Sequence, residues 1–285
     1  MKTLASEYPI VELCQALGLS RSGYYQWLNR PESRRAKANR EVLAKISVLH
    51  EENRRCYGSP RITQALRRQG LTIGHNRVAR LMRTQGIRAK SKRAFRPRTT
   101  DSRHAERIAP NRLKQLPSLH RPDQAWVADI TYIWTVAGWV YLAAVMDLYS
   151  RKIVGWALGT SLETSLVTEA LSRAQRERRP APGLLHHSDR GSQYASSAFQ
   201  ALLAHFKIIP SMSGLAHCYD NAAMESFWSS LKNELVHHEP FANLDEARLA
   251  IFDYIELFYN RKRLHSALGY QSPVEFENQI VYKNN

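Results

Sequence analysis

The hydrophobic pattern of this chain changes its period near residue 124, and that change limits the possible folds more than any single motif. Val127 to Trp134 is rich in β-branched and aromatic residues, and Val140 to Met146 is a near-continuous apolar run typical of a buried strand. Lys152 to Leu158 predicts a third strand. Helix and strand patterns then alternate, giving the order β-β-β-α-β-α-β-α. Residues 124–285 are therefore predicted to form an α/β domain with a mixed sheet.

The residues before 88 carry helical periodicity instead. Apolar residues at helical spacing, followed by Gly18-Leu19-Ser20 as a turn and N-cap, predict a helix-turn-helix segment within residues 1–36. A second helix-turn-helix, DNA-binding domain is predicted at 37–87, where Ser59-Pro60 caps and opens a helix and Gly70 closes it. An ordinary helical hairpin without a role in DNA binding fits the first segment equally well.

Charge is distributed unevenly along the chain. The formal net charge is +16, and residues 1–123 hold 27 of the 41 Lys and Arg but 9 of the 25 Asp and Glu. A basic front half favours a polyanionic partner, and the folded apolar pattern beneath it favours double-stranded DNA over a membrane surface. The chain has no run of about 18 apolar residues and no secretory leader pattern, so we expect a cytoplasmic protein that does not contact membranes.

Basic side chains recur at positions where a helix-turn-helix meets DNA. Arg77, Arg80 and Arg83 share one face of the last helix predicted in this half, and Arg21 stands at the start of an earlier helix. Residues 88–123 are predicted to be a basic linker that contacts phosphates. A solvated basic face and a disordered linker are the alternatives. The DNA contacts predicted in this half are Arg21, Arg61, Arg77, Arg80, Lys90, Lys92 and Arg93.

Three acids in the second half stand in segments suited to a metal-bound carboxylate. Asp129 interrupts the first apolar strand, Asp189 ends a short strand, and Glu225 lies on a predicted helix after an interval of 35 residues. Asp is depleted in strands, so Asp129 calls for a partner, and a cation is the best candidate. Taken singly, Asp189 could form a turn and Glu225 could be an exposed helix residue. Asp147, at the end of the second strand, is an alternative to Asp129 as the acid of the site. We favour Asp129 because the first strand of such a sheet is usually central.

Phosphodiester cleavage is the chemistry that such a set of acids suits. An in-line attack needs a positioned oxygen nucleophile and neutralisation of the charge that grows on the leaving oxygen, and two cations about 4 Å apart supply both. Mg²⁺ takes oxygen ligands and needs only a few protein carboxylates, because the substrate phosphate supplies further oxygens. We therefore predict that Asp129, Asp189 and Glu225 are catalytic, metal-binding residues.

Several longer motifs resemble one protein family. They are Trp126 to Tyr132, Val145 to Trp156, His187 to Tyr194, Asp220 to Phe227 and Tyr259 to His265, with Tyr57 to Ile62 in the front half and Ala267 to Val274 in the tail. Together with the 35-residue interval, these motifs resemble the transposases of the insertion sequence three family, as the product of their second reading frame. The resemblance covers the chain nearly end to end. It implies a catalytic core similar to retroviral integrases, with a ribonuclease-H-like fold.

The resemblance also implies roles for particular residues and partners. The three acids would bind two Mg²⁺ or Mn²⁺ ions, and Lys232, two helical turns after Glu225, would contact transposon-end DNA. A plain surface lysine is the alternative for Lys232. A homo-oligomer is expected because two element ends must be brought together, and the family implies fusion or association with the protein of the upstream reading frame.

A basic cluster near the C-terminus is a second predicted DNA contact. Arg261, Lys262 and Arg263 follow an amphipathic helix that begins near Asn243 and Glu246, a capping-box pattern. A salt-bridged structural turn is the alternative reading of this cluster.

The sequence as a whole predicts a DNA transposase. It would cut at the ends of an insertion element to free a 3′-OH, which would then attack another DNA phosphate in the same site, so that the reaction is a DNA integration. Its DNA partners would be the terminal repeats of the element and the target DNA. Two other functions stay open: a ribonuclease-H-like nuclease that cuts without joining, and a DNA-binding regulator that has lost catalysis.

Overall fold

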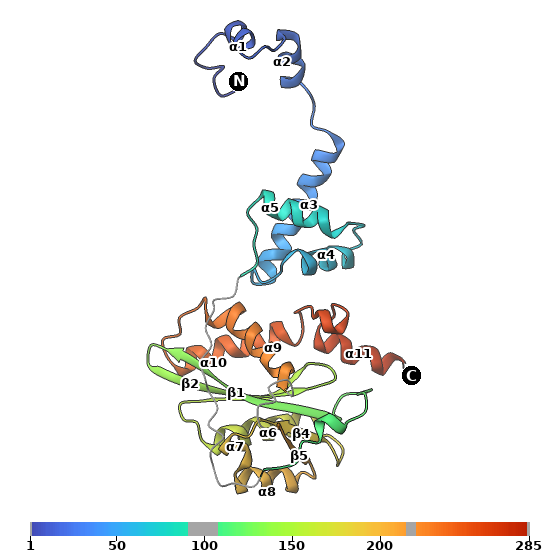
Figure 1. Cartoon of the computed structure of the whole chain (residues 1–285), viewed down its shortest axis with the longest axis vertical. Helices are drawn as coiled ribbons and strands as arrows, with labels where there is room; N and C mark the ends of the chain where they lie inside the picture. Colours follow the sequence, from blue (N-terminus) through green and yellow to red (C-terminus); the bar gives the residue numbers. More distant parts are fainter. Residues whose placement is uncertain (1, 91–107, 215–220, 284–285) are drawn as a thin grey trace.

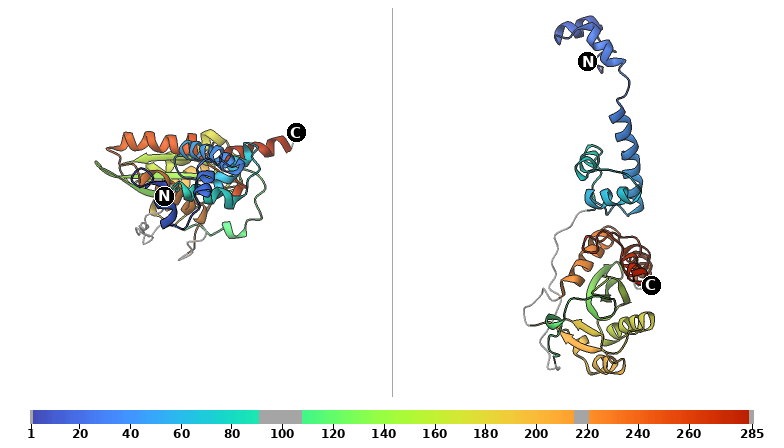
Figure 2. Two further views of the ribbon diagram at one scale, coloured as in Figure 1. Left: turned by 90° about the horizontal axis from the view of Figure 1, so that it is seen from above. Right: turned by 90° about the vertical axis from the view of Figure 1, so that its right-hand side faces the viewer.

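The computed structural model of the chain describes residues 2–90, 108–214 and 221–283. Figure 1 shows a helical front part that leads into an α/β domain, and Figure 2 shows that α1 and α2 lie at the far end of the molecule from the sheet. Within the described residues, no helix is both long enough and apolar enough to cross a membrane. The predicted DNA contacts Lys92 and Arg93 lie outside the described residues.

The front part contains the two predicted helix-turn-helix pairs. Its helices are α1 (Ile10–Ala16), α2 (Arg21–Leu28), α3 (Arg34–Glu52), α4 (Ser59–Arg68) and α5 (His75–Thr84). The Ser20 hydroxyl accepts a hydrogen bond from the Gly23 amide, so this residue caps α2 as predicted. The prediction for α4 is wrong by one residue, because Gly58 is the N-cap and Ser59 is already helical.

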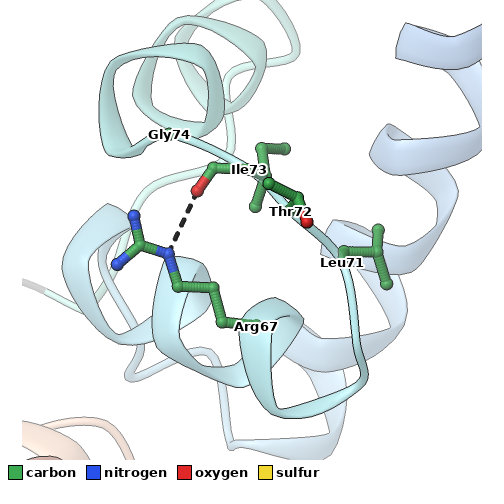
Figure 3. Close-up of a pocket in the computed structure, with 5 residues that line it drawn as sticks. All are labelled: Arg67, Leu71, Thr72, Ile73 and Gly74. Carbon is green, nitrogen blue, oxygen red and sulfur yellow. Dashed lines mark hydrogen bonds between the residues drawn. The ribbon is translucent and has the colours of Figure 1, made fainter.

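The α4–α5 pair is closed across its turn by a side chain. Arg67 Nε donates a hydrogen bond to the Ile73 carbonyl at 3.1 Å, over the hollow that Leu71, Thr72 and Gly74 also line (Figure 3). Beneath the turn, apolar residues from three helices are fully or almost fully buried: Ile46, Ile62, Leu66, Val78 and Met82. The pair is thus fixed against α3, and α5 is held as a rigid element.

A five-stranded mixed sheet forms the centre of the α/β domain. Its strands are β1 (Ala125–Thr135), β2 (Gly138–Asp147), β3 (Ile153–Gly159), β4 (Leu185–Ser188) and β5 (Ile209–Met212). Their order in the sheet is β3-β2-β1-β4-β5, with β1 to β3 antiparallel and β1, β4 and β5 parallel. The predicted mixed sheet is confirmed. The first strand, β1, is its central strand, which was the reason for favouring Asp129 over Asp147.

Two hydrophobic cores lie on the two faces of the sheet, because side chains alternate along each strand. One face packs on α6 (Thr164–Arg178), α7 (Ser192–Ala195) and α8 (Ser197–His205). The other face packs on α9 (Ala222–Leu231) and on the C-terminal helices. The element order is the predicted one, except that α7 adds a short turn before α8.

The chain after α9 is a helical tail that covers the second face. It comprises η3 (Lys232–Val236, a π-helical turn), α10 (Leu244–Phe252), η4 (Asp253–Tyr259, π-helical), η5 (Ser266–Leu268) and α11 (Pro273–Lys283). The Asn243 side chain accepts from the Glu246 amide, and the Glu246 carboxylate accepts from the Ala242 amide. The predicted capping box is therefore confirmed, with its return bond one residue before Asn243.

Gly155 marks the closest approach between β3 and α6. A Cβ atom at this position would lie 2.4 Å from the Ala170 carbonyl oxygen and 2.6 Å from the Ala174 nitrogen. We expect Gly155→Ala to lower the free energy of unfolding by about 1–3 kcal/mol, because backbone atoms of a packed helix cannot move aside cheaply. Chemical denaturation followed by circular dichroism measures the change.

The matched control for this substitution is Gly159→Ala in the same strand. Its added Cβ would lie 3.4 Å from Leu166 Cδ1, which belongs to a side chain that can adjust. Equal losses of stability in the two variants would contradict the close-approach argument.

Candidate active site

Asp129 lies in the middle of the sheet on β1, opposite Ala144 of β2. Its Oδ1 accepts a hydrogen bond from the Ile130 amide at 2.8 Å, and its Oδ2 accepts one from Trp228 Nε1 of α9 at 3.0 Å. The central strand and the covering helix thus hold the carboxylate from two sides.

Asp189 follows β4, the parallel neighbour of β1. Val127 pairs with His187 in this ladder, so Asp129 and Asp189 each stand two residues beyond the same pair. Asp189 Oδ1 accepts from the Gly191 amide at 2.9 Å, which fixes the turn after the strand. The predicted turn role of Asp189 and its place beside Asp129 are therefore compatible, and the register of β1 and β4 brings the two acids side by side, just beyond the end of the parallel ladder.

The electrostatics of Asp129 reflect this placement. Burial, and next the charge of Asp189, raise the pKa of Asp129 to about 7, against the two hydrogen bonds that lower it. Glu225 makes a smaller contribution in the same direction. Asp129 is therefore a carboxylate whose charge the metal-free protein disfavours.

Glu225 lies in the first turn of α9 and is exposed. It precedes Trp228 by three residues, so both side chains belong to one face of the helix that approaches Asp129. Over the part of the chain that the structure describes, no three His, Cys, Asp or Glu side chains stand close enough to form a metal-holding group. Asp129 and Asp189 are brought together, and Glu225 stands farther out on the adjoining helix.

Lys232 begins the π-helical turn η3 and is half-buried. Burial lowers the pKa of its ammonium group, and the charge of Asp129 acts in the opposite direction. The attraction between this ammonium group and the carboxylate of Asp129 indicates that Lys232 lies in the neighbourhood of the two acids. Lys232 is therefore more than a fully solvated surface lysine.

Asp147, the rival acid, has a structural environment. It is fully buried, and its carboxylate accepts hydrogen bonds from the Asp123 amide, the Ser150 amide and the Ser150 hydroxyl at 2.7, 2.8 and 3.0 Å. These donors satisfy the side chain within the turn after β2. Asp147 therefore has a structural role, since it holds the turn after β2 and the segment before β1.

Two residues near the acids were not found from the sequence. Trp228 holds Asp129, and its spacing of three from Glu225 on a helix is a signal that pattern reasoning could have used. Tyr194 of α7 has a buried hydroxyl without a hydrogen-bond partner in the described chain. Burial, then Asp129 and Asp189, raise its pKa well above the usual value, so it stays protonated. Nothing in the sequence around Tyr194 indicated that its side chain would lie near the two acids.

Three of the predicted DNA contacts are engaged inside the protein instead. Arg263 is 5% exposed and donates to the Glu234 carboxylate at 2.7 Å. Arg61 donates to the Leu264 carbonyl at 2.9 Å, and Lys90 donates to the Glu234 carbonyl at 3.1 Å. Arg263 is buried and its donors are taken up by Glu234, which leaves it no access to DNA. Arg61 and Lys90 each keep further N–H donors, so their DNA contacts stay predictions. For Arg263, the alternative of a salt-bridged turn is the correct one.

The remaining basic candidates differ in their accessibility. Arg77 Nε donates to Asn39 Oδ1 of α3 at 2.9 Å, which fixes its side chain beside α5. The candidates that stay exposed are Arg21, Arg80, Arg261 and Lys262.

Three family profiles match the chain. An HTH-like domain matches residues 37–95, and two integrase core domain profiles match residues 119–218 and 225–281. These boundaries correspond to the α3–α5 part and to the α/β domain with its tail.

Relatives of nearly the same length are similar along the whole chain. A protein of insertion element IS600 from Shigella sonnei, described as an uncharacterized 31 kDa protein, is 45% identical over 93% of this chain and 97% of its own length. The transposase InsF for insertion sequence IS3A from Escherichia coli (strain K12) is 38% identical over 96% of both chains. Among solved structures, the catalytic core domain of BIV integrase matches 57% of this chain and 98% of its own length, with a TM-score of 0.43 and 15% identity.

The raised pKa of Asp129 predicts an unusual dependence of stability on pH. Since its folded-state pKa of about 7 exceeds the ordinary value of 3.8, the folded chain keeps a proton that the unfolded chain gives up, and stability falls as the pH rises from 3.8 to about 7. We expect Asp129→Asn to raise the melting temperature of the metal-free protein at about pH 8 and to change it much less at about pH 4. Millimolar Mg²⁺ should stabilise the parent at the higher pH and not the variant.

Thermal melts at both pH values, with and without Mg²⁺, provide the measurement. The control is Asp147→Asn, which should lower the melting temperature because two backbone amides and a hydroxyl donate to that carboxylate. It should keep the response to Mg²⁺. A parental melting temperature for Asp129→Asn at the higher pH would contradict the electrostatic account.

Proposed function

The chain belongs to the insertion sequence IS3 family of transposases, with a ribonuclease-H-like integrase core, and from this premise we propose that Asp129, Asp189 and Glu225 are its catalytic acids. The observation that carries the proposal is the parallel register of β1 and β4, which sets Asp129 beside Asp189. The repulsion between the two carboxylates contributes to the raised pKa of Asp129. DNA transposition is the activity of the chain.

The donor set fits a divalent cation that prefers oxygen. Asp129 and Asp189 repel each other in a partly buried place, and each has lone pairs beyond those used by Ile130, Trp228 and Gly191. A hard cation such as Mg²⁺ removes this repulsion and takes carboxylate oxygens as ligands. We propose that Asp129 and Asp189 hold Mg²⁺ or Mn²⁺, and that Glu225 completes a two-ion site from α9.

The bound ions would activate the attacking oxygen and neutralise charge on the leaving oxygen. The protein's own part is to fix the acids. Trp228 orients Asp129 through Oδ2, the Gly191 amide orients Asp189, and Lys232 offers a cation for a phosphate oxygen beside the scissile bond. Water would then break the phosphodiester at an element end to leave a 3′-OH, and this hydroxyl would attack a phosphate of target DNA in the same site.

DNA recognition is assigned to the front part and to exposed basic residues. The proposed contacts are Arg21, Arg77, Arg80, Lys232, Arg261 and Lys262, with Lys92 and Arg93 of the linker. We further propose that the active form is a homo-oligomer that holds two element ends, joined or associated with the product of the upstream reading frame.

The catalytic acids are tested by charge-removing substitutions. Asp189→Asn and Glu225→Gln should each reduce Mg²⁺-dependent cleavage and strand transfer on element-end DNA by about a thousandfold or more, because each removes a proposed metal ligand. Binding of end DNA should persist, since neither side chain is a proposed DNA contact. Gel assays with labelled ends measure both products.

The product pattern separates the alternatives. Cleavage without a joined product would favour a nuclease, and the absence of any Mg²⁺-dependent product in the parent would favour a DNA-binding regulator. Full activity of Asp189→Asn would overturn the assignment of the acids.

The distinction between exposed and engaged arginines is tested by the salt dependence of DNA binding. Arg80 is exposed on α5, so Arg80→Ala should weaken binding severalfold and reduce the salt slope by about one unit, as expected for one lost phosphate contact. Glu41→Gln, an exposed change on α3, is the control and should keep the slope. Fluorescence anisotropy over a series of salt concentrations gives these slopes, and an unchanged slope for Arg80→Ala would remove it from the interface.

A further inference from the structure

Glu234 is a buried carboxylate where the helical front part meets the tail of the α/β domain. It lies in η3, which continues α9 without a break, so Glu225 and Glu234 belong to one helical stretch. Its exposed fraction is 7%. A carboxylate buried to this degree is tolerated only when its charge and its lone pairs are matched by donors.

Side chains of the C-terminal tail donate hydrogen bonds to the carboxylate of Glu234. Arg263 Nε and Nη2 donate to its oxygens at 2.7 to 3.1 Å, and the Tyr254 hydroxyl donates to Oε2 at 2.9 Å. Burial by itself would lower the pKa of Arg263, but the charge and hydrogen bonds of Glu234 outweigh it and raise that pKa. The result is a fixed, ionised pair that anchors η3 to the tail.

The front part reaches the same residue from the other side. Lys90 Nζ donates to the Glu234 carbonyl at 3.1 Å, the Cys56 thiol lies 3.9 Å from that oxygen, and Arg61 Nη1 lies 3.8 Å from Oε1. Carbonyls near the end of a helix lack ordinary intrahelical partners, and lysine side chains are suitable donors for them. The front part therefore caps the helical stretch that carries Glu225.

Tyr57 fixes the front part on the tail. Its hydroxyl accepts from the Leu264 amide at 2.8 Å and donates to the Lys262 carbonyl at 3.2 Å, while its side chain is 1% exposed. The apolar residues of α3–α5 and those of the tail form one continuous core. Separation of the two parts would leave buried polar groups unpaired, so the junction favours a single arrangement.

We propose that Glu234 is a positioning residue: the helix-turn-helix domain docks on it and thereby fixes α9, so that DNA-end binding at α5 is coupled to the placement of Glu225. The inference rests on the proposed role of Glu225 in catalysis. It explains why a basic domain directs Lys90 to the Glu234 carbonyl and Arg61 towards the Glu234 carboxylate rather than to solvent. In this proposal the helix-turn-helix domain, which binds the DNA end, also holds the end of the helical stretch formed by α9 and η3.

The closing experiment compares three single substitutions in the full chain. Tyr57→Phe removes the junction's hydroxyl from the front part, and Glu234→Gln removes the buried charge. Glu275→Gln is the control, because Glu275 also joins the two parts, through an exposed ion pair with Arg68 at 3.1 Å. Exposed pairs of this kind contribute little.

The expected result is a separation of catalysis from binding. Tyr57→Phe and Glu234→Gln should bind end DNA within about twofold of the parent, yet cleave saturating DNA about tenfold more slowly and need severalfold more Mg²⁺ for half-maximal rate. Glu275→Gln should match the parent in all three measurements. A parallel fall in DNA affinity and cleavage rate, with an unchanged Mg²⁺ requirement, would mean a merely structural junction and would overturn the proposal.

Hydrogen exchange gives a readout that does not require activity. In Tyr57→Phe the Leu264 amide loses its acceptor and should exchange faster, and the amides of α9 should follow if the junction fixes that helix. Faster exchange at Leu264 with parental exchange along α9 would overturn the coupling. Absence of cleavage in the parent would contradict the proposed function and leave the coupling between the junction and α9 to be decided by the exchange result on Tyr57→Phe. The same exchange result decides the inference if Glu234→Gln fails to fold.

Discussion

The in-register parallel pairing of β1 with β4 is the constraint on which the candidate site depends. Backbone hydrogen bonds set Val127 opposite His187, and the two acids that follow therefore lie side by side whether or not their charges are compatible. The cohesion of the sheet is spread over many residues, whereas the repulsion concerns two side chains. The fold therefore maintains an arrangement that the carboxylates would avoid by themselves, and a divalent cation gains affinity from relieving it.

Three buried or partly buried acids of the domain show how environment decides role. Asp147 is satisfied by two amides and a hydroxyl, and Glu234 is neutralised by Arg263. Asp129 receives one amide and one indole donor, faces a second acid, and has no compensating cation at bonding distance in the described structure. Acids of the first two kinds hold a turn or a junction together. An acid such as Asp129, whose negative charge is not compensated within the described structure, is suited to binding a cation or taking part in catalysis.

The sequence predicted most of the fold and named the acids of the candidate site, and it did so for physical reasons. Period-two and period-3.6 patterns depend on local burial, so β1 to β5 and the helix-turn-helix pairs were predictable from apolar residues alone. Long-range pairing was not. The hydrogen bond from Trp228 to Asp129 spans 99 positions, and the contact of Lys90 with Glu234 spans 144. Arg61, Lys90 and Arg263 have the composition of a DNA surface, and only the tertiary structure reveals that each of them donates to a carbonyl or carboxylate of the chain itself.

The charge asymmetry of the chain thus acts at two levels. The front half is strongly basic and the second half slightly acidic, which suits attraction to DNA and also suits docking of one half on the other. The two interactions respond differently to ionic strength. The contacts proposed from Arg80 or Arg261 to phosphates would be screened by salt, whereas the buried contacts around Glu234 are shielded from it. Under the proposed roles, salt would release DNA while the junction persists, and the helix bearing Glu225 would stay aligned between one DNA encounter and the next.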